Sequence, residues 1–409
     1  MRTQRTPSEC PAIVVLTLLP CVAAFASAQE RFPSPAQGNE RRNGMVCPSS
    51  PRIGVRNQEE EMTNQPHIIG VDLGKHWFHV MGLDREGAIV LRKKLSRAQL
   101  RAFAATIPRS IVAMEACCGS QYWGRVFVQA GHEVRIVPAQ FVKPYVKTNK
   151  NDFNDAEAIA EAASRATMRF VPLKTTEQLE LQASHRIRRR LVHERTAVVN
   201  QLRALLLEYG IVTPVGRETF ARRWSQTLGS AREQLSPRLL VLIQRLRAHW
   251  VTLDGQIAEA TQELTAWADR SPLCQRVATV PGVGPMIATA LVSAVGDARM
   301  FARGRDMAAW LGLVPRQHST GGKSTLGRIS RRGNGYLRQL FLQGAVSAYL
   351  WMKRDRSALG AWLQQLDRRR HRPVVITALA NKLVRICWKV LTSDTPFRLH
   401  PARPVEHAV

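Results

Sequence analysis

The chain has 409 residues, 45 % of them apolar, so it is long enough for two or three domains and most of it is expected to fold. Lys and Arg outnumber Asp and Glu by 59 to 31, and the net charge of +28 predicts a polyanionic partner, either nucleic acid or an acidic membrane surface. The seven Cys are odd in number and form no C-x-x-C pair, which argues against a disulfide framework or a structural zinc site.

Residues 1–61 form an atypical leader. Residues 1–28 resemble a secretory signal, with basic residues before an apolar run that ends in Ala26-Ser27-Ala28. Residues 29–61 lack periodicity, as is typical of disorder. A basic protein without paired Cys fits poorly outside the cell, and an ordered strand follows Met62 at once. We therefore expect Met62 to be the true start and the protein to be cytoplasmic and nucleoid-associated. No other segment is long and apolar enough to span a membrane.

Residues 62–175 are predicted to form a mixed α/β domain. Short apolar strands alternate with helical patterns over residues 67–149, and a further helix begins near residue 154. The resulting order β-β-β-α-β-α-β-α is that of a ribonuclease-H-type sheet.

Residues 176–270 are predicted to be a coiled-coil segment of two long helices. The first, over 176–208, has an apolar stripe made of Leu179, Ala183, Ile187, Leu191, Val198, Leu202 and Leu205. Its basic cluster is denser than solubility requires, so Arg186, Arg189 and Arg190 are candidate nucleic-acid contacts. The second, over 238–268, carries apolar residues at alternating spacings of four and three. It pairs either with the first helix or with another protomer.

Residues 271–395 are predicted to form a mainly helical C-terminal domain, followed by a tail over 396–409. It opens on a Gly-hinged helical pair similar to a helix-hairpin-helix. Gly282 and Gly284 in its turn could direct backbone N–H groups at a phosphate, although a plain tight turn explains them too. The stretch "STGGKST" (319–325) follows as a flexible loop, then a basic turn and an apolar helix, and a last helix covers about 373–392.

Four carboxylates are candidates for a two-metal site. Asp72 and Glu115 lie in or at the end of apolar strands, where a charge is costly unless it is paired or metal-bound. Asp152 and Asp155 are spaced to share one helix face. Together they could hold two divalent cations, Mg²⁺ or Mn²⁺, for phosphoryl transfer. Asp155 could instead only favour a helix N-terminus capped by Asn154, with Glu157 completing a capping box.

From about Met62 to Leu391 the chain resembles transposases of the IS110 family, most of all the IS1111 group. The resemblance rests on "GVDLGK", "AMEACCGS", "NKNDFNDAEAIAEA", "VPGVGPMIATAL" and "GLVPRQHSTGGKSTLGRISRRGNGYLR". It implies a RuvC-like domain whose D-E-D-D set is Asp72, Glu115, Asp152 and Asp155. It also implies a C-terminal transposase domain with a nucleophilic serine, and a DNA recombinase that a structured noncoding RNA guides to donor and target DNA. Such enzymes act as homo-oligomers with composite active sites.

The nucleophile is assigned to Ser319, with Thr320 as the nearest alternative and Ser324 as a weaker one. The family motif is commonly Ser-Gly-Lys, and here an additional residue intervenes. A P-loop is excluded because Gln317 stands where its first glycine belongs. Candidate phosphate contacts near the serine are Lys323, Arg328, Arg331, Arg332 and Arg338.

Two other functions compete with the covalent recombinase. A junction-resolving nuclease would use the same carboxylates with activated water. A non-catalytic DNA- or RNA-binding protein would explain the charge, but not acidic residues within strands.

Overall fold

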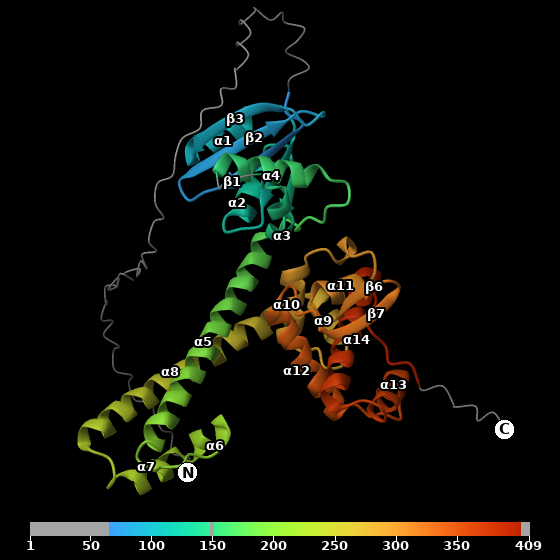
Figure 1. Cartoon of the computed structure of the whole chain (residues 1–409). Helices are drawn as coiled ribbons and strands as arrows, with labels where there is room; N and C mark the ends of the chain where they lie inside the picture. The colour runs from blue at the N-terminus through green and yellow to red at the C-terminus, as the bar shows by residue number, and fades with distance from the viewer. Residues whose placement is uncertain (1–64, 148–150, 402–409) are drawn as a thin grey trace, which may run out of the picture. The chain divides into compact units, whose positions relative to one another are not determined.

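A computed structural model of the protein describes residues 65–147 and 151–401 (Figure 1). The predictions for the leader, its signal-like segment and a start at Met62 lie outside these residues. So do the final residues of the predicted tail. None of the described helices has an apolar stretch long enough to cross a membrane.

The N-terminal region is a five-stranded sheet in the order β3-β2-β1-β4-β5. Strands β1, β2 and β3 are antiparallel neighbours, whereas β1, β4 and β5 run parallel. This confirms the predicted element order and the mixed sheet. The strands are β1 (Ile68–Leu73), β2 (Trp77–Leu83), β3 (Ile89–Ser96), β4 (Ile111–Glu115) and β5 (Glu133–Val137).

Helices cover both faces of this sheet. On one face, α1 (Arg97–Thr106) and α2 (Ser120–Gln129) pack on Ile69 and Val71 of β1. On the other face α4 (Asp152–Ser164) packs on Ile68, because side chains alternate along a strand. The short segments α3 (Ala139–Val142) and η2 (Lys143–Tyr145) lead from β5 towards α4.

Gly70 allows α4 to lie unusually close to β1. A Cβ at Gly70 would stand 2.0 Å from the carbonyl oxygen of Ala156 and 2.8 Å from the backbone nitrogen of Ala160. Only a glycine on the strand therefore permits this separation. The residues of α4 that face the sheet are mostly alanines, whose small side chains also allow the close approach. The close approach positions the first turn of α4 beside the end of β1.

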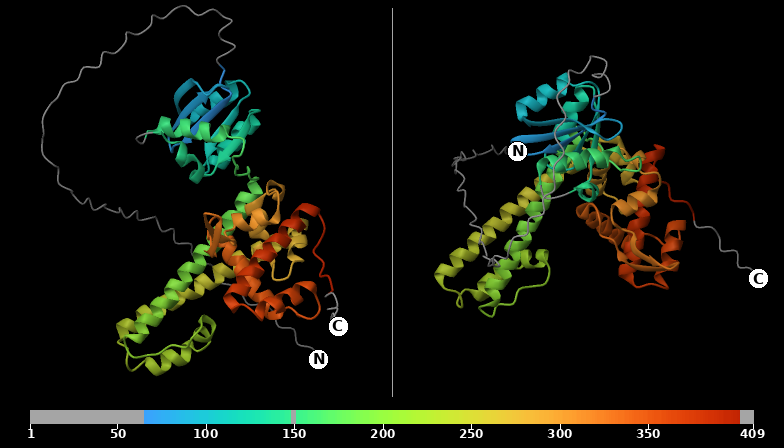
Figure 2. Two further views of the ribbon diagram at one scale, coloured as in Figure 1. Left: turned by 45° about the vertical axis from the view of Figure 1, so that its right-hand side comes forward. Right: turned by 45° about the horizontal axis from the view of Figure 1, so that its top comes forward.

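The middle region is built on two long helices, α5 (Thr176–Leu207) and α8 (Pro237–Arg270). They pack against each other (Figures 1 and 2), so the apolar seam of α8 has α5 as a partner within the chain. Buried on that seam are Ile243, Trp250, Leu253, Ile257 and Leu264. The short helices α6 (Arg217–Arg222) and α7 (Trp224–Ala231), which were not predicted, connect the pair.

The predicted stripe of α5 is wrong in its first half. Ile187 is 59 % exposed, whereas Leu181 and His185 are buried there. The apolar spacing cannot reveal this face because one of its buried members is a polar histidine. In the second half Val198 and Leu202 are buried, as predicted. Supercoiling of the pair stays a prediction.

The C-terminal region is mainly helical around one hydrophobic core. The helical pair α9 (Pro272–Ala278) and α10 (Pro285–Val295) is present, and so are the predicted helices α12 (Gly335–Trp351) and α14 (Arg372–Ser393). Helices α11 (Gly304–Trp310) and α13 (Ala358–Asp367) were not predicted. Assignment of α9–α10 to the helix-hairpin-helix class stays a prediction.

Two local predictions are corrected by the structure. The stretch at 319–325 is no flexible loop but the end of a β-hairpin, β6 (Pro315–Thr320) and β7 (Lys323–Ile329). Gly321 and Gly322 both have positive φ, which a two-residue hairpin turn requires. Helix α4 is capped by Asn151, whose side chain accepts a hydrogen bond from the Phe153 N–H, and not by Asn154. Glu157 accepts from Lys147 and takes no part in a capping box.

Candidate active site

Two of the four predicted carboxylates meet at one edge of the sheet. Asp72 is next to last in β1, and Glu115 ends the neighbouring parallel strand β4. The register pairs Val71 with Met114, so Asp72 and Glu115 follow at the same level. Both residues are half-buried.

Helix α4 supplies the other two carboxylates from its first turn. Asp152 and Asp155 are both placed there by the Asn151 cap and by the close packing of α4 on Gly70. Asp155 is half-buried, and the Asp152 side chain is 58 % exposed. The structure therefore brings all four predicted residues to one region of the N-terminal sheet.

The carboxylates repel one another. Burial raises the pKa of Asp72 to about 6, and the negative charges of Asp155, Asp152 and Glu115 add to the effect. Burial, followed by the charge of Asp155, also raises the pKa of Glu115. Within the described residues, neither Asp72 nor Glu115 has an ion-pair partner among the basic side chains. The site thus accumulates negative charge that a cation would offset.

The donor chemistry fits hard divalent cations, which prefer carboxylate oxygens. The described part of the chain nevertheless contains no group of three or more His, Cys, Asp or Glu side chains gathered closely enough to hold an ion as they stand. The four carboxylates therefore offer suitable ligands and surplus charge without forming a closed cage.

His79 is a member of this site that the sequence analysis missed. It lies opposite Asp72 in the β1–β2 register and is buried. Its Nδ1 is 3.5 Å from Oδ2 of Asp152, and its ring packs edge-on against Phe153 with centroids 4.7 Å apart. Arg92 on β3 covers the Phe153 ring at 4.2 Å. A polar residue inside the apolar stretch "WFHVMGLD" was the available signal.

The hairpin presents its hydroxyls on both faces. Ser319 and Ser324 are directly paired across the strands, and Thr320 is paired with Lys323. Because side chains alternate along a strand, Ser319 and Ser324 share one face and Thr320 lies on the other. All are exposed, and the Oγ of Ser319 accepts a hydrogen bond of 2.8 Å from Nε2 of Gln317. Among the described residues, no hydrogen bond or ion pair joins this hairpin to the carboxylates.

The predicted basic contacts near the serine fall into two groups. Lys323, Arg328, Arg331 and Arg332 are exposed on β7 and the turn after it. Arg338 is half-buried, and its Nη1 donates to the carbonyls of Leu311 and Arg332 at 2.9 and 2.7 Å. Arg338 therefore holds the base of the hairpin in place, which is a structural reason for its presence.

The remaining predicted nucleic-acid contacts lie on α5 and in the α9–α10 turn. Arg186, Arg189 and Arg190 are exposed on α5. Gly282 has a φ of +76°, and a Cβ there would stand 2.2 Å from the carbonyl oxygen of Gly344 in α12. Its lack of a side chain is thus explained by close packing of the turn on α12. Gly284 is the N-cap of α10 and has open space around it.

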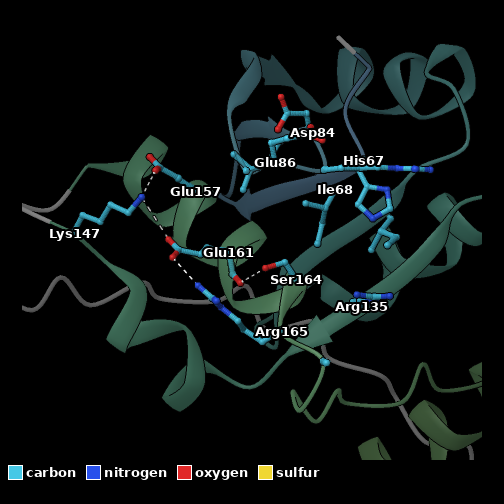
Figure 3. Close-up of a pocket in the computed structure, with 15 residues that line it drawn as sticks. His67, Ile68, Asp84, Glu86, Arg135, Lys147, Glu157, Glu161, Ser164 and Arg165 are labelled. Atoms are coloured by element: carbon cyan, nitrogen blue, oxygen red, sulfur yellow. Dashed lines mark hydrogen bonds and ion pairs between the residues drawn. The ribbon is translucent and has the colours of Figure 1, made fainter. Parts of the chain in front are cut away.

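A cavity of about 680 Å³ lies at the other end of the sheet, beside the beginnings of β1 and β4 at Ile68 and Ile111. Figure 3 shows two of its acidic side chains, Glu157 and Glu161, paired with basic ones. Lys147 lies 2.8 Å from Glu157 and 3.5 Å from Glu161, and Arg165 lies 3.1 Å from Glu161. None of the four predicted carboxylates lines this cavity, so it is distinct from the candidate active site.

Two family models match the chain. Residues 69–211 match one described as a transposase with a DEDD domain of IS110 type, and residues 274–360 match the transposase IS116/IS110/IS902 family.

Full-length relatives are similar over most of their own length. The chain is 45 % identical to a probable family 20 transposase of Pseudomonas aeruginosa over 81 % of this chain and 98 % of that protein. It is 44 % identical to the transposase for insertion sequence element IS1328 of Yersinia enterocolitica, with the same coverage. It is 40 % identical to the transposase for IS1111A of Coxiella burnetii, over 85 % of this chain and 95 % of that protein.

Proposed function

This chain belongs to the IS116/IS110/IS902 family of transposases, and we propose that it cuts and rejoins DNA strands through a covalent phosphoserine intermediate. The observation that carries the proposal is the gathering of Asp72, Glu115, Asp152 and Asp155 in the matched DEDD domain, where burial and, after it, the neighbouring carboxylate charges raise the pKa of Asp72. Acidic side chains crowded in this way are suited to phosphoryl transfer.

Asp72, Glu115, Asp152 and Asp155 would hold Mg²⁺ or Mn²⁺. Bound there, the ions would supply charge stabilisation for a phosphorane-like transition state and favour loss of a proton from the attacking hydroxyl. Asp72 and Glu115 sit on the strands and would fix the position of the site, whereas Asp152 is more exposed and its orientation would depend on His79.

Ser319 would be the nucleophile. Its Oγ loses a proton and attacks phosphorus, the bond from phosphorus to the 3′ oxygen breaks, and that oxygen takes up a proton to leave as a 3′ hydroxyl. A 3′ hydroxyl of another strand then attacks the serine phosphodiester, so the bond energy is kept and no nucleotide cofactor is needed. The exposed position of Ser319 on a hairpin suits approach to DNA from solvent.

The partners follow from the same assignment. Donor and target DNA would be selected by pairing with an element-encoded noncoding RNA, and a homo-oligomer would bring the serine of one protomer to the carboxylates of another. The exposed basic residues Lys323, Arg328 and Arg332 flank the serine and would contact phosphates. The enzyme would act in the cytoplasm, on nucleoid DNA.

A trapped protein–DNA adduct tests this mechanism. Purified enzyme is incubated with labelled DNA carrying its element ends, denatured, digested and examined for a phosphodiester-modified peptide. Ser319→Ala should abolish both the adduct and strand joining, whereas Thr320→Ala and Ser324→Ala should leave the adduct in place.

Ser319→Ala and a further variant, Asp72→Asn, discriminate the competing mechanisms. Normal cleavage by Ser319→Ala without any adduct would indicate a nuclease that uses activated water. Metal-dependent cleavage that disappears in Asp72→Asn would exclude a purely binding protein.

A further inference from the structure

A second, smaller cavity lies where α5 meets the C-terminal helices. Its volume is about 330 Å³, within the range of small-ligand sites, and we call it the α5 pocket. Arg186 and Arg189 line it from α5, and Lys174 lines it from the segment just before that helix. Trp310, Asn334 and Tyr336 line it from the C-terminal region.

The α5 pocket is strongly basic. Three cationic side chains line it and no Asp or Glu does. Lys174 is half-buried, and its burial, together with the charge of Arg186, lowers its pKa. Cations crowded in this way repel each other, so an anion between them would remove an electrostatic cost. Neutral hydrogen-bonding groups, Asn334 and the Tyr336 hydroxyl, complete a lining suited to phosphate oxygens.

His185 gives this pocket a fixed wall. It is 3 % exposed, and its ring nitrogens lie 3.0 Å from the Tyr336 hydroxyl of α12 and 3.0 Å from Oγ1 of Thr289 in α10. Gln182, one turn earlier on α5, donates to the Ser293 carbonyl of α10. The guanidinium of Arg189 in turn lies 5.5 Å from the centre of the Tyr336 ring. The three helices therefore preorganise Tyr336 and, through it, Arg189.

We propose that the α5 pocket binds a backbone phosphodiester of nucleic acid through Arg186, Arg189 and Lys174. The assignment rests on the proposed DNA-processing function and adds a specific anchoring site whose lining includes neither the four carboxylates nor Ser319. A phosphodiester fits because the lining combines a focused positive charge with a hydroxyl and an amide, and because exposed Arg190 on the same helix extends the charge beyond the cavity. The phosphate could come from DNA or from RNA.

The test is the salt dependence of binding, measured with full-length Ser319→Ala protein in buffer without divalent metal, so that no strand is cut whichever mechanism holds. Fluorescence anisotropy gives the affinity for a labelled duplex DNA and, separately, for a labelled RNA hairpin over a series of salt concentrations. Log affinity falls as log salt rises, and each lost phosphate contact reduces the steepness of that fall by about 0.9 for duplex DNA. Arg186→Gln and Arg189→Gln should each lower it by about that amount. The matched control is Arg245→Gln, an exposed arginine of α8 outside the pocket.

The outcomes separate the two sources of phosphate. A reduced slope with the DNA alone assigns the pocket to DNA, and a reduced slope with the RNA alone assigns it to RNA. Slopes equal to that of Arg245→Gln with both probes would overturn the proposal. Because the assay measures binding alone, evidence against the phosphoserine mechanism would not change the salt slopes. Unchanged salt slopes would likewise not contradict the phosphoserine mechanism.

Discussion

His79 and Asp152 face each other at the edge of the N-terminal sheet, with Nδ1 of the histidine 3.5 Å from Oδ2 of the aspartate. The two residues come from different layers, since His79 is on β2 and Asp152 opens α4 on the sheet face. The histidine is buried and fixed against Phe153, whereas Asp152 is largely exposed. His79 can therefore restrict the orientation of an otherwise mobile carboxylate.

His79→Ala is expected to weaken metal use more than it weakens folding. Without the imidazole, Asp152 loses its only partner among the described ion pairs and samples more rotamers. The Mg²⁺ or Mn²⁺ concentration for half-maximal DNA cleavage should therefore rise about 10-fold. That factor is the lower end of the loss in metal affinity typical when a residue that orients a metal ligand is removed. Maximal cleavage at saturating metal should change less. His79→Gln keeps a hydrogen-bonding group and should recover part of the affinity. An unchanged metal dependence in both variants would show that His79 has only a packing role.

Gly70→Ala is expected to disrupt the site by pushing α4 from the sheet. The added Cβ would overlap the Ala156 carbonyl oxygen, and neither backbone can yield without moving Asp152 and Asp155. Overpacking of this kind should cost about 3 kcal/mol of unfolding free energy, measured by urea denaturation, and should abolish cleavage.

Gly255→Ala is the matched control for that substitution. Gly255 lies within α8, and apart from its own turn of helix no atom lies within 4 Å of its missing Cβ, so alanine should stabilise the protein by up to about 1 kcal/mol. Equal stability of the Gly70 and Gly255 variants would mean that α4 is free to shift without cost.

The sheet could be predicted from the sequence because β1, β2 and β4 are short, largely apolar runs, and such runs alternate with helical patterns along the chain. Asp72 and Glu115 could be predicted because a charge inside an apolar strand stands out, and Asp152 and Asp155 because their spacing puts them on one helix face. His79 was missed because a single histidine in a strand is usually explained by packing in the core. Its role here depends on a helix that begins more than 70 residues later in the chain. The hairpin was missed because its strands are polar and fully exposed on both faces, so they show no hydrophobic alternation.

Asp72→Asn is expected to stabilise the metal-free protein at neutral pH. The folded state raises the pKa of Asp72 from 3.8 to about 6, so it favours the protonated form, and ionisation destabilises the fold progressively as the pH rises from about 4 to 6. The difference in unfolding free energy between variant and wild type should therefore grow over this range and level off above it. Added Mg²⁺ should raise the melting temperature of wild type more than that of Asp72→Asn. A pH-independent difference would contradict the crowding of charge around Asp72.

His185 is expected to produce the opposite pH dependence. Burial, aided by Arg188, lowers its pKa from 6.5 to about 4, so the fold favours the neutral imidazole that contacts Tyr336 and Thr289. The unfolded chain binds a proton below pH 6.5 and the folded chain does not, so stability is complete above pH 6.5 and falls as the pH drops towards 4, by up to about 3 kcal/mol. In His185→Gln this loss should disappear from urea-denaturation curves, although the variant should be less stable at pH 7. If His185→Gln loses the same amount of stability at acidic pH, another group causes the loss. Urea-denaturation curves measured in the same way on Asp72→Asn would show whether the opposing titrations of Asp72 and His185 mask each other in the wild type.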